Sequence, residues 1–194
     1  MSAHVKSDTN TATHSIFKRL FYSPLLYPLI RVQTYMQSHY KFPVGEKLPT
    51  LKESLNIIKN EGGLYRGYSL HFAYNAGVLA CWGINPFLGF ASIGLLYPLE
   101  LAQIYMASHG TSHINALDRI KSNLLSKSNY RGVAINFLSF IDPSGFFFNN
   151  IKRNLILSTE DGKPSTYREV FKGLSASGML LRGAVPGLIL FLFR

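Results

Sequence analysis

Charged residues are scarce in this sequence. Only 15% of the 194 residues are charged, whereas 47% are hydrophobic and 13% are aromatic. Soluble globular domains carry about 25% charged residues, and a chain of this length suits one domain. The low charge content therefore favours a single-domain, membrane-associated protein.

Cysteine is nearly absent, and the N-terminus has no apolar run that ends in a small-residue cleavage site. The single Cys81 excludes an intrachain disulfide, and its apolar surroundings beside Trp82 indicate a small core residue rather than a reactive thiol. We expect no secretory signal. The polar segment 1–15 is expected to form a tail, and residues 16–194 a single membrane domain.

Acidic residues are half as frequent as basic ones, with 10 Asp+Glu against 20 Lys+Arg. A basic excess is compatible with nucleic-acid binding, which rests on phosphate contacts. Here the basic residues occur as short pairs between apolar blocks, such as Lys18-Arg19 and Lys152-Arg153. This pattern suits anionic lipid head groups, so we expect anionic lipids and no nucleic acid as partners.

Catalytic and metal-binding patterns are also missing. The six histidines show no ligand spacing, no nucleophile motif occurs, and Gly62-Gly63 is too short for a phosphate loop. We therefore expect no enzyme activity, no metal, and no cofactor apart from structural lipid.

Long uninterrupted apolar runs are lacking too, although apolar stretches dominate the chain. They lie at about 16–36, 68–107, 133–157 and 179–193. Prolines interrupt the first three, at Pro24 and Pro28, at Asn85-Pro86, and at Asp142-Pro143. Since a proline removes a donor and disfavours helix at the preceding residue, no stretch is a clean bilayer span of about 20 residues. The sequence predicts an all-α membrane protein with short or broken transmembrane helices.

A threefold repeat becomes visible when the glycines are aligned. LKESLNIIKNEGGLYRG, ALDRIKSNLLSKSNYRG and YREVFKGLSASGMLLRG end at Gly67, Gly132 and Gly183. Each is preceded by an earlier glycine, Gly45, Gly110 or Gly162, and further upstream by a proline, Pro28, Pro98 or Pro143. The repeats are expected at about 16–83, 84–141 and 142–194.

Each repeat also predicts a short amphipathic helix between its two glycines. Thr50-x-x-Glu53 and Thr166-x-x-Glu169 fit the capping box at a helix start. Apolar residues then fall on one face, namely Leu51, Leu55 and Ile58 in the first repeat, and Leu117, Ile120 and Leu124 in the second. Such helices lie on a membrane surface.

This pattern resembles the mitochondrial carrier family, in which each of three repeats has a helix kinked at P-x-[DE]-x-x-[KR], a surface helix, and a helix opened by [YWF]-[KR]-G. Tyr65-Arg66-Gly67 and Tyr130-Arg131-Gly132 match the last motif, whereas Leu181-Arg182-Gly183 has lost the aromatic residue. The resemblance implies a multi-pass protein of the mitochondrial inner membrane.

The resemblance also implies a gate of ion pairs, and most of that gate is missing. Ile30, Glu100 and Gly145 hold its acidic positions, while Gln33, Gln103 and Phe148 hold its basic positions. A carboxylate on an apolar helix needs a partner. We expect Glu100 to pair with Arg31, with a hydrogen bond to Gln33 as the alternative.

The spacing of the motifs excludes a complete carrier barrel. Two bilayer crossings need roughly 40 residues at about 1.5 Å per residue. Gly67 and Pro98 are 31 positions apart, Gly132 and Pro143 only 11, and Gly183 is followed by 11 residues. We expect stubs or re-entrant helices whose backbone ends are covered by neighbouring proteins.

Two functions follow from these observations. The first is a non-transporting pseudo-transporter, an accessory subunit of an inner-membrane assembly such as a respiratory-chain complex or an ATP synthase. The alternative is a minimal carrier for a small anionic metabolite, with contacts from Asn75, Asn136 and Arg182. In either case the resemblance implies cardiolipin sites at helix N-termini. The expected residues are Arg66, Gly67, Arg131, Gly132, Arg182 and Gly183, with Gly45, Gly110 and Gly162 at the surface helices.

Overall fold

The computed structural model describes residues 21–38, 48–109, 113–121, 130–138, 147–158 and 166–192, and every regular element in these ranges is helical. A helix over 21–37 comes first. It is followed by α2 (Leu51–Asn60), α3 (Tyr68–Ile84), α4 (Pro86–Leu95), α5 (Tyr97–His109), α6 (His113–Lys121), α7 (Val133–Leu138), α8 (Phe147–Leu157), α9 (Tyr167–Ala176), the short 3-10 helix η3 (Met179–Leu181) and α10 (Ala184–Leu192). The all-α prediction is confirmed.

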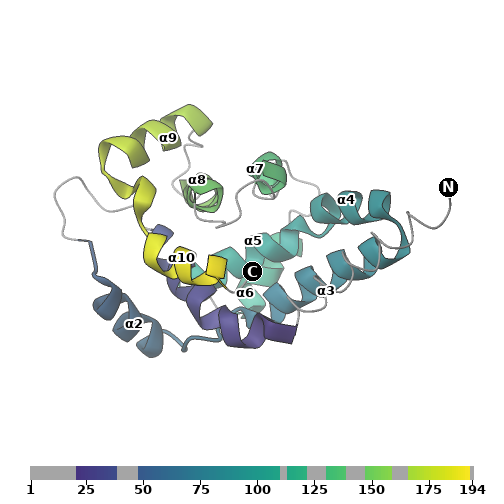
Figure 1. Cartoon of the computed structure of the whole chain (residues 1–194), viewed down its shortest axis with the longest axis horizontal. Coiled ribbons are helices and arrows are strands. Elements are labelled where there is room, and N and C mark those ends of the chain that lie inside the picture. Colours follow the sequence, from purple (N-terminus) through teal and green to yellow (C-terminus); the bar gives the residue numbers. More distant parts are fainter. Residues whose placement is uncertain are drawn as a thin grey trace.

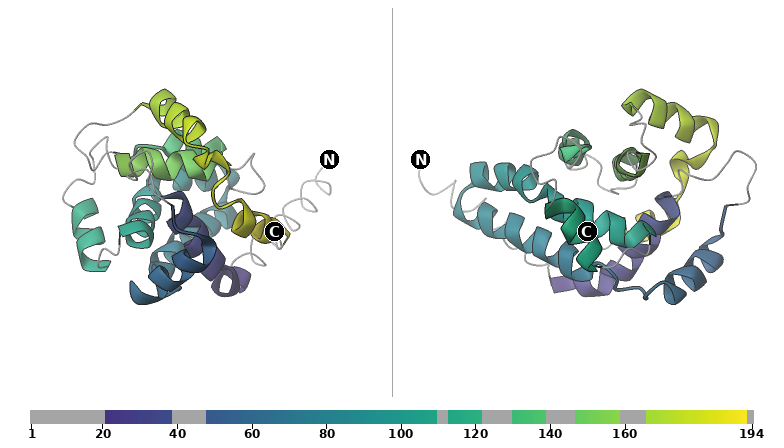
Figure 2. Two further views of the ribbon diagram at one scale, coloured as in Figure 1. Left: turned by 90° about the vertical axis from the view of Figure 1, so that its left-hand side faces the viewer. Right: turned by 180° about the vertical axis from the view of Figure 1, so that it is seen from behind.

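Helices α3 and α4 lie side by side as an antiparallel hairpin at one end of the molecule, and α2 and α9 lie at the opposite end (Figures 1 and 2). The predicted break at Asn85-Pro86 is confirmed, because it forms the turn of this hairpin. A proline at the first position of α4 loses no helix hydrogen bond.

The helix over 21–37 corrects the expectation for the first apolar stretch. It continues through both Pro24 and Pro28. Its second half is buried on all sides over 31–35, and Tyr27 and Val32 pack against other helices. Tertiary packing of this kind supplies most of the stability of helices in proteins, so it offsets the hydrogen bond that a proline removes.

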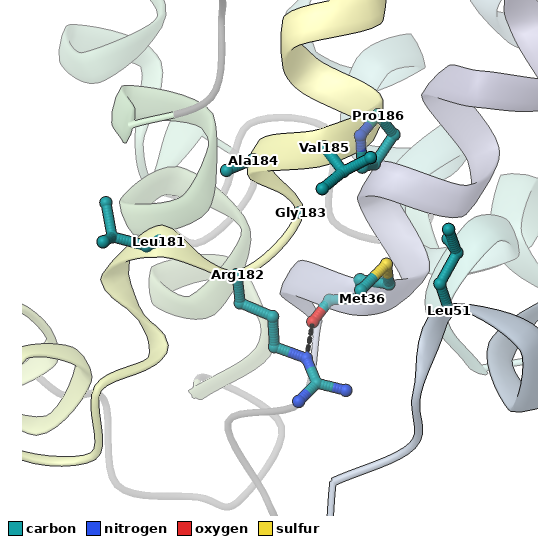
Figure 3. Close-up of a pocket in the computed structure, with 8 residues that line it drawn as sticks. All are labelled: Met36, Leu51, Leu181, Arg182, Gly183, Ala184, Val185 and Pro186. Carbon is teal, nitrogen blue, oxygen red and sulfur yellow. Dashed lines mark hydrogen bonds between the residues drawn. The ribbon is translucent and has the colours of Figure 1, made fainter.

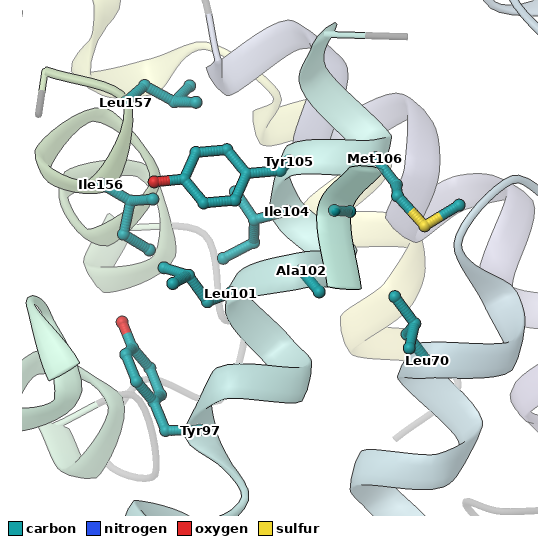
Figure 4. Close-up of a cluster of buried hydrophobic side chains, with 10 residues drawn as sticks. Leu70, Tyr97, Leu101, Ala102, Ile104, Tyr105, Met106, Ile156 and Leu157 are labelled. Carbon is teal, nitrogen blue, oxygen red and sulfur yellow. The ribbon is translucent and has the colours of Figure 1, made fainter. Parts of the chain in front are cut away.

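The main hydrophobic core is built around α5. Its Leu101, Ile104 and Tyr105 face α8, while Met106 lies toward Leu70 of α3 (Figure 4). A second cluster joins α7, α8 and α9, and a third joins the helix over 21–37 to α2. Helix α5 thus connects the hairpin to the rest of the chain.

Among the described residues, no single helix combines the length and apolarity needed to cross a bilayer. Two pairs of consecutive helices meet both conditions when taken together. Pro86–Leu95 with Tyr97–Ser108 is bent by 45°, and Tyr167–Ala176 with Met179–Leu190 is bent by 97°. Helices α7 and α8 are seen nearly end-on in Figure 1, so they run across the direction of the α3–α4 hairpin.

Candidate functional site

The three arginines of the repeat motif have backbone carbonyls that accept hydrogen bonds in similar ways. The Tyr27 hydroxyl donates to the carbonyl of Arg66 at 2.6 Å, and the Tyr97 hydroxyl donates to that of Arg131 at 2.7 Å. Tyr27 and Tyr97 each directly precede a repeat proline. In the third case the Gln37 side-chain amide donates to the Arg182 carbonyl at 3.3 Å. Each motif is therefore held by a side chain from another helix.

The glycines that follow these arginines make the contacts between repeats. Gly67, Gly132 and Gly183 have φ of 83°, 89° and 82°, a region that favours glycine. A Cβ on Gly67 would lie 3.6 Å from Gln103, on Gly132 3.3 Å from Lys152, and on Gly183 3.4 Å from Gln33. Each repeat thus touches the next, and the third touches the first.

Glu100 has a partner that sequence reasoning did not assign. Lys152 Nζ on α8 lies 2.5 Å from Glu100 Oε1 on α5, where Lys152 is 2% and Glu100 18% exposed. Lys152 also donates to Asn136 Oδ1 at 2.8 Å, and Asn136 donates to the Tyr74 hydroxyl at 2.9 Å. The pair therefore belongs to a polar network that joins α3, α5, α7 and α8. The expected pairing of Glu100 with Arg31, or with Gln33, is corrected.

Arg31 instead lies fully buried at 0% exposure. Its three guanidinium nitrogens have no hydrogen-bond partner among the described residues, and the same is true of Gln33 Nε2. Removing a guanidinium from water without such partners is costly. Arg31 is consequently a buried charge without a hydrogen-bond partner among the described residues.

The Lys152-Arg153 pair does not lie at a surface, which corrects the interpretation of it as a contact with lipid head groups. Both residues are buried. Arg153 donates from a terminal guanidinium nitrogen to Gln37 Oε1, and the Asn154 amide donates to the Gln37 carbonyl at 2.7 Å. Gln37 therefore links the first repeat to α8 as well as to Arg182.

The other expected gate positions are neutral. Gln33 and Gln103 are buried, and the Gln103 amide lies 3.5 Å from the Tyr27 hydroxyl. Ile30 and Phe148 are half-buried, while Gly145 lies outside the described residues. One ion pair, Glu100–Lys152, thus occupies a cluster that is otherwise built from amides and arginines.

The three polar residues considered as contacts for a small anion all have partners within the protein. Asn75 donates to the His71 carbonyl at 2.7 Å, and Asn136 belongs to the Lys152 network. Arg182 donates to the carbonyls of Met36 at 2.7 Å and Pro49 at 2.8 Å. Asn75 thus binds within its own helix, while Asn136 and Arg182 hold different helices and loops together.

A cavity of about 220 Å³ lies beside Arg182, between the first and third repeats (Figure 3). Its lining is mostly apolar and includes Met36, Leu181 and Val185. Leu51 and Ala184, the first residues of α2 and α10, also line it, so two helix N-termini meet there.

Among the other residues expected to bind cardiolipin, Arg66 does not line this cavity, and its side chain donates to the carbonyl of Glu61. Gly45, Gly110 and Gly162 lie outside the described residues.

The predicted surface helices begin as expected, since both capping boxes are confirmed at Thr50–Glu53 and Thr166–Glu169. The backbone N–H of Thr166 donates to the exposed Glu169 carboxylate and lowers its pKa. In α2, Ile58 is buried and Leu55 half-buried, but Leu51 is exposed because it borders the cavity. Leu117 is half-buried in α6, while the Ile120 side chain and Leu124 lie outside the described set.

No protein-family model matches the chain, and no curated protein is significantly similar to it.

Proposed function

We propose that this chain is a carrier-like membrane protein that does not transport and that serves as a structural accessory subunit of a large mitochondrial inner-membrane assembly. The fold is a degenerate carrier with three repeats, short or broken transmembrane helices, and surface helices such as α2 and α9. The host assembly is a respiratory complex or an ATP synthase.

The contacts between repeats support the carrier relationship. The carbonyls of Arg66, Arg131 and Arg182 all accept side-chain hydrogen bonds from other helices. The glycine after each arginine packs on the following repeat, and Gly183 packs on the first. This cyclic order is what three similar repeats around one axis would produce.

The centre of this arrangement supports the loss of transport. Lys152 and Glu100 are locked together, and Lys152 is bound to Asn136 as well. A gate that opens must exchange its ion pairs, and breaking a buried pair by loss of one partner costs roughly 3–5 kcal/mol. The other described gate positions are neutral, so they cannot form ion pairs that would offset this cost in an open state.

The short helices carry the proposal of a host assembly. Gly132 and Phe147 are 15 positions apart, so a path out and back between them reaches only about 11 Å if helical. Helix α7 has 6 residues, and its Phe137 and Leu138 are exposed. A path that turns back after about 11 Å would end inside the hydrocarbon, where its backbone groups must be covered by protein. Neighbouring subunits would provide that cover.

The cavity beside Arg182 is the proposed cardiolipin site. The N-terminus of α10 offers partial positive charge to a phosphate, and the apolar lining suits acyl chains. The N-terminus of α2 is already capped by Thr50 and Glu53. The Arg182 guanidinium adds a full positive charge at the edge of the cavity.

Native electrophoresis of mitochondrial membranes in mild detergent tests the subunit role. We expect the chain to migrate with a large assembly and to leave it only under harsher detergent. Migration as a small free species under mild conditions would contradict the proposal.

One observation favours the second candidate, a minimal carrier for a small anion. Arg31, Lys152 and Arg153 are buried. Of these three cations, only Lys152 forms an ion pair with a described carboxylate, that of Glu100. Uptake of labelled small anions into vesicles that contain the purified chain decides between the two. Saturable uptake that Arg31→Gln abolishes would support the carrier, whereas rates equal to those of empty vesicles would support the structural role.

A further inference from the structure

The α3–α4 hairpin has an apolar surface that the other described residues do not cover. No Asp, Glu, Lys or Arg occurs between Arg66 and Glu100. At the turn, Ile84 is 76% and Phe87 79% exposed. Every exposed position of α4 is apolar, and these positions are Pro86, Phe87, Leu88, Phe90, Ala91 and Leu95. Apolar exposure on all free sides of a helix suits a surrounding apolar solvent better than one protein partner.

The turn pairs several of its backbone groups within the protein. The Asn85 side chain accepts from the Phe87 N–H at 2.7 Å, and Pro86 has no N–H to satisfy. The Asn85 N–H donates to the Cys81 carbonyl at 3.0 Å, and the Asn85 carbonyl accepts from Gly89 at 2.9 Å. In hydrocarbon each unpaired backbone group is costly, so a turn there requires internal partners of this kind.

The hairpin is also too short to pass beyond the far side of a bilayer. Gly67 and Gln103 lie side by side at its base, and each is 18 positions from Asn85. At about 1.5 Å per residue each leg reaches at most about 27 Å, against about 30 Å of hydrocarbon. The amphipathic helices α2 and α9 lie at the end of the molecule away from the turn (Figures 1 and 2).

The two legs are held together by close packing instead of polar contacts. A Cβ on Gly89 would lie 2.4 Å from the Trp82 ring, and a Cβ on Gly77 would lie 2.6 Å from Leu96. Glycines of this kind allow helices to approach closely in membranes. The hairpin is therefore a unit that needs no further element at its tip.

We propose that α3–α4 is a re-entrant hairpin whose turn at Asn85-Pro86 lies inside the bilayer, with lipid acyl chains as the occupant of its exposed surface. The inference rests on the membrane location proposed above. It adds that this part of the surface faces lipid, whereas the neighbouring subunits cover the α7 side.

The single tryptophan of the chain, Trp82, is a native probe of the turn. The purified chain is reconstituted in phosphatidylcholine vesicles whose acyl chains carry bromine either near the head group or near the bilayer centre. We expect deep bromines to quench Trp82 at least as strongly as shallow ones, and acrylamide in water to quench it little. The matched control is Trp82→Phe with Tyr65→Trp, which moves the probe next to Arg66. It should be quenched mainly by shallow bromines.

Three outcomes overturn the hairpin. These are strong quenching of Trp82 by acrylamide, stronger quenching by shallow than by deep bromines, and no quenching by either reagent, which would mean that protein covers the turn. Alkaline carbonate extraction of the same vesicles separates this failure from failure of the membrane location. Release of the chain by carbonate contradicts both proposals, while retention with an acrylamide-quenched Trp82 contradicts the hairpin alone.

Discussion

Replacing Lys152 by methionine removes the cation from the Glu100 network while it keeps most of the side-chain volume. Glu100 Oε1 then loses its only described donor, and Glu100 Oε2 already has no partner. Asn136 Oδ1 loses a donor as well. Loss of one member of a buried ion pair costs about 3–5 kcal/mol, so we expect Lys152→Met to lower the free energy of unfolding by an amount in this range.

Glu100→Gln should cost less stability, because the Lys152 ammonium still donates to Asn136 Oδ1 and can donate to the amide oxygen that replaces the carboxylate. The double variant Lys152→Met with Glu100→Gln should lose about 2 kcal/mol less stability than the sum of the two single variants, since it leaves no unpaired charge behind. Denaturant unfolding in detergent micelles, followed by circular dichroism, measures all three. A Lys152→Met variant within about 0.5 kcal/mol of the parent chain, which is the usual size of a neutral surface substitution, would refute the reasoning.

Three further predictions follow from single positions. Gly67→Ala should destabilise the chain by about 1 kcal/mol more than Gly63→Ala in the same unfolding assay, because both have positive φ but only Gly67 has the Tyr27 hydroxyl 2.9 Å from its Cβ position. Phe87→Lys should oppose membrane insertion in an insertion assay by less than the roughly 2.5–3.5 kcal/mol of a lysine at a helix centre, whereas Ser69→Lys near the hairpin base should have a smaller effect still. The Glu169 cap should contribute stability above the pKa of the unfolded chain and lose it as the pH falls through the lower folded pKa; a carboxyl NMR titration should show a Glu169 pKa below 4.5 that rises in Thr166→Val.

Local features were predictable from the sequence because their causes are local. A hydroxyl and a carboxylate three residues apart suffice for the boxes at Thr50 and Thr166. At Asn85-Pro86 a helix ends because the proline favours an extended Asn85, whose side chain then caps the next helix at Phe87. The repeated Arg-Gly pairs indicated turns, and their glycines have positive φ.

The partner of Glu100 could not be found in this way. Lys152 is 52 positions away, and its neighbour Arg153 made the pair look like a lipid-facing surface motif. One signal was present, because Lys152-Arg153 lies inside an apolar stretch where unpaired charge is costly. Alignment of the third repeat on Pro143 places Gly145 and Phe148 in the gate and passes over the two cations. Likewise Gln37 gave no sign in the sequence that it joins Arg153 and Arg182.

The mass of the particle that carries the chain, after extraction from its native membrane in mild detergent, tests the central claim most directly. The chain alone has a mass of 21.8 kDa. The account predicts a particle many times heavier, of constant composition, in which the chain is present in fixed ratio to its neighbours. A particle with the mass of one or two chains plus detergent and lipid would contradict it.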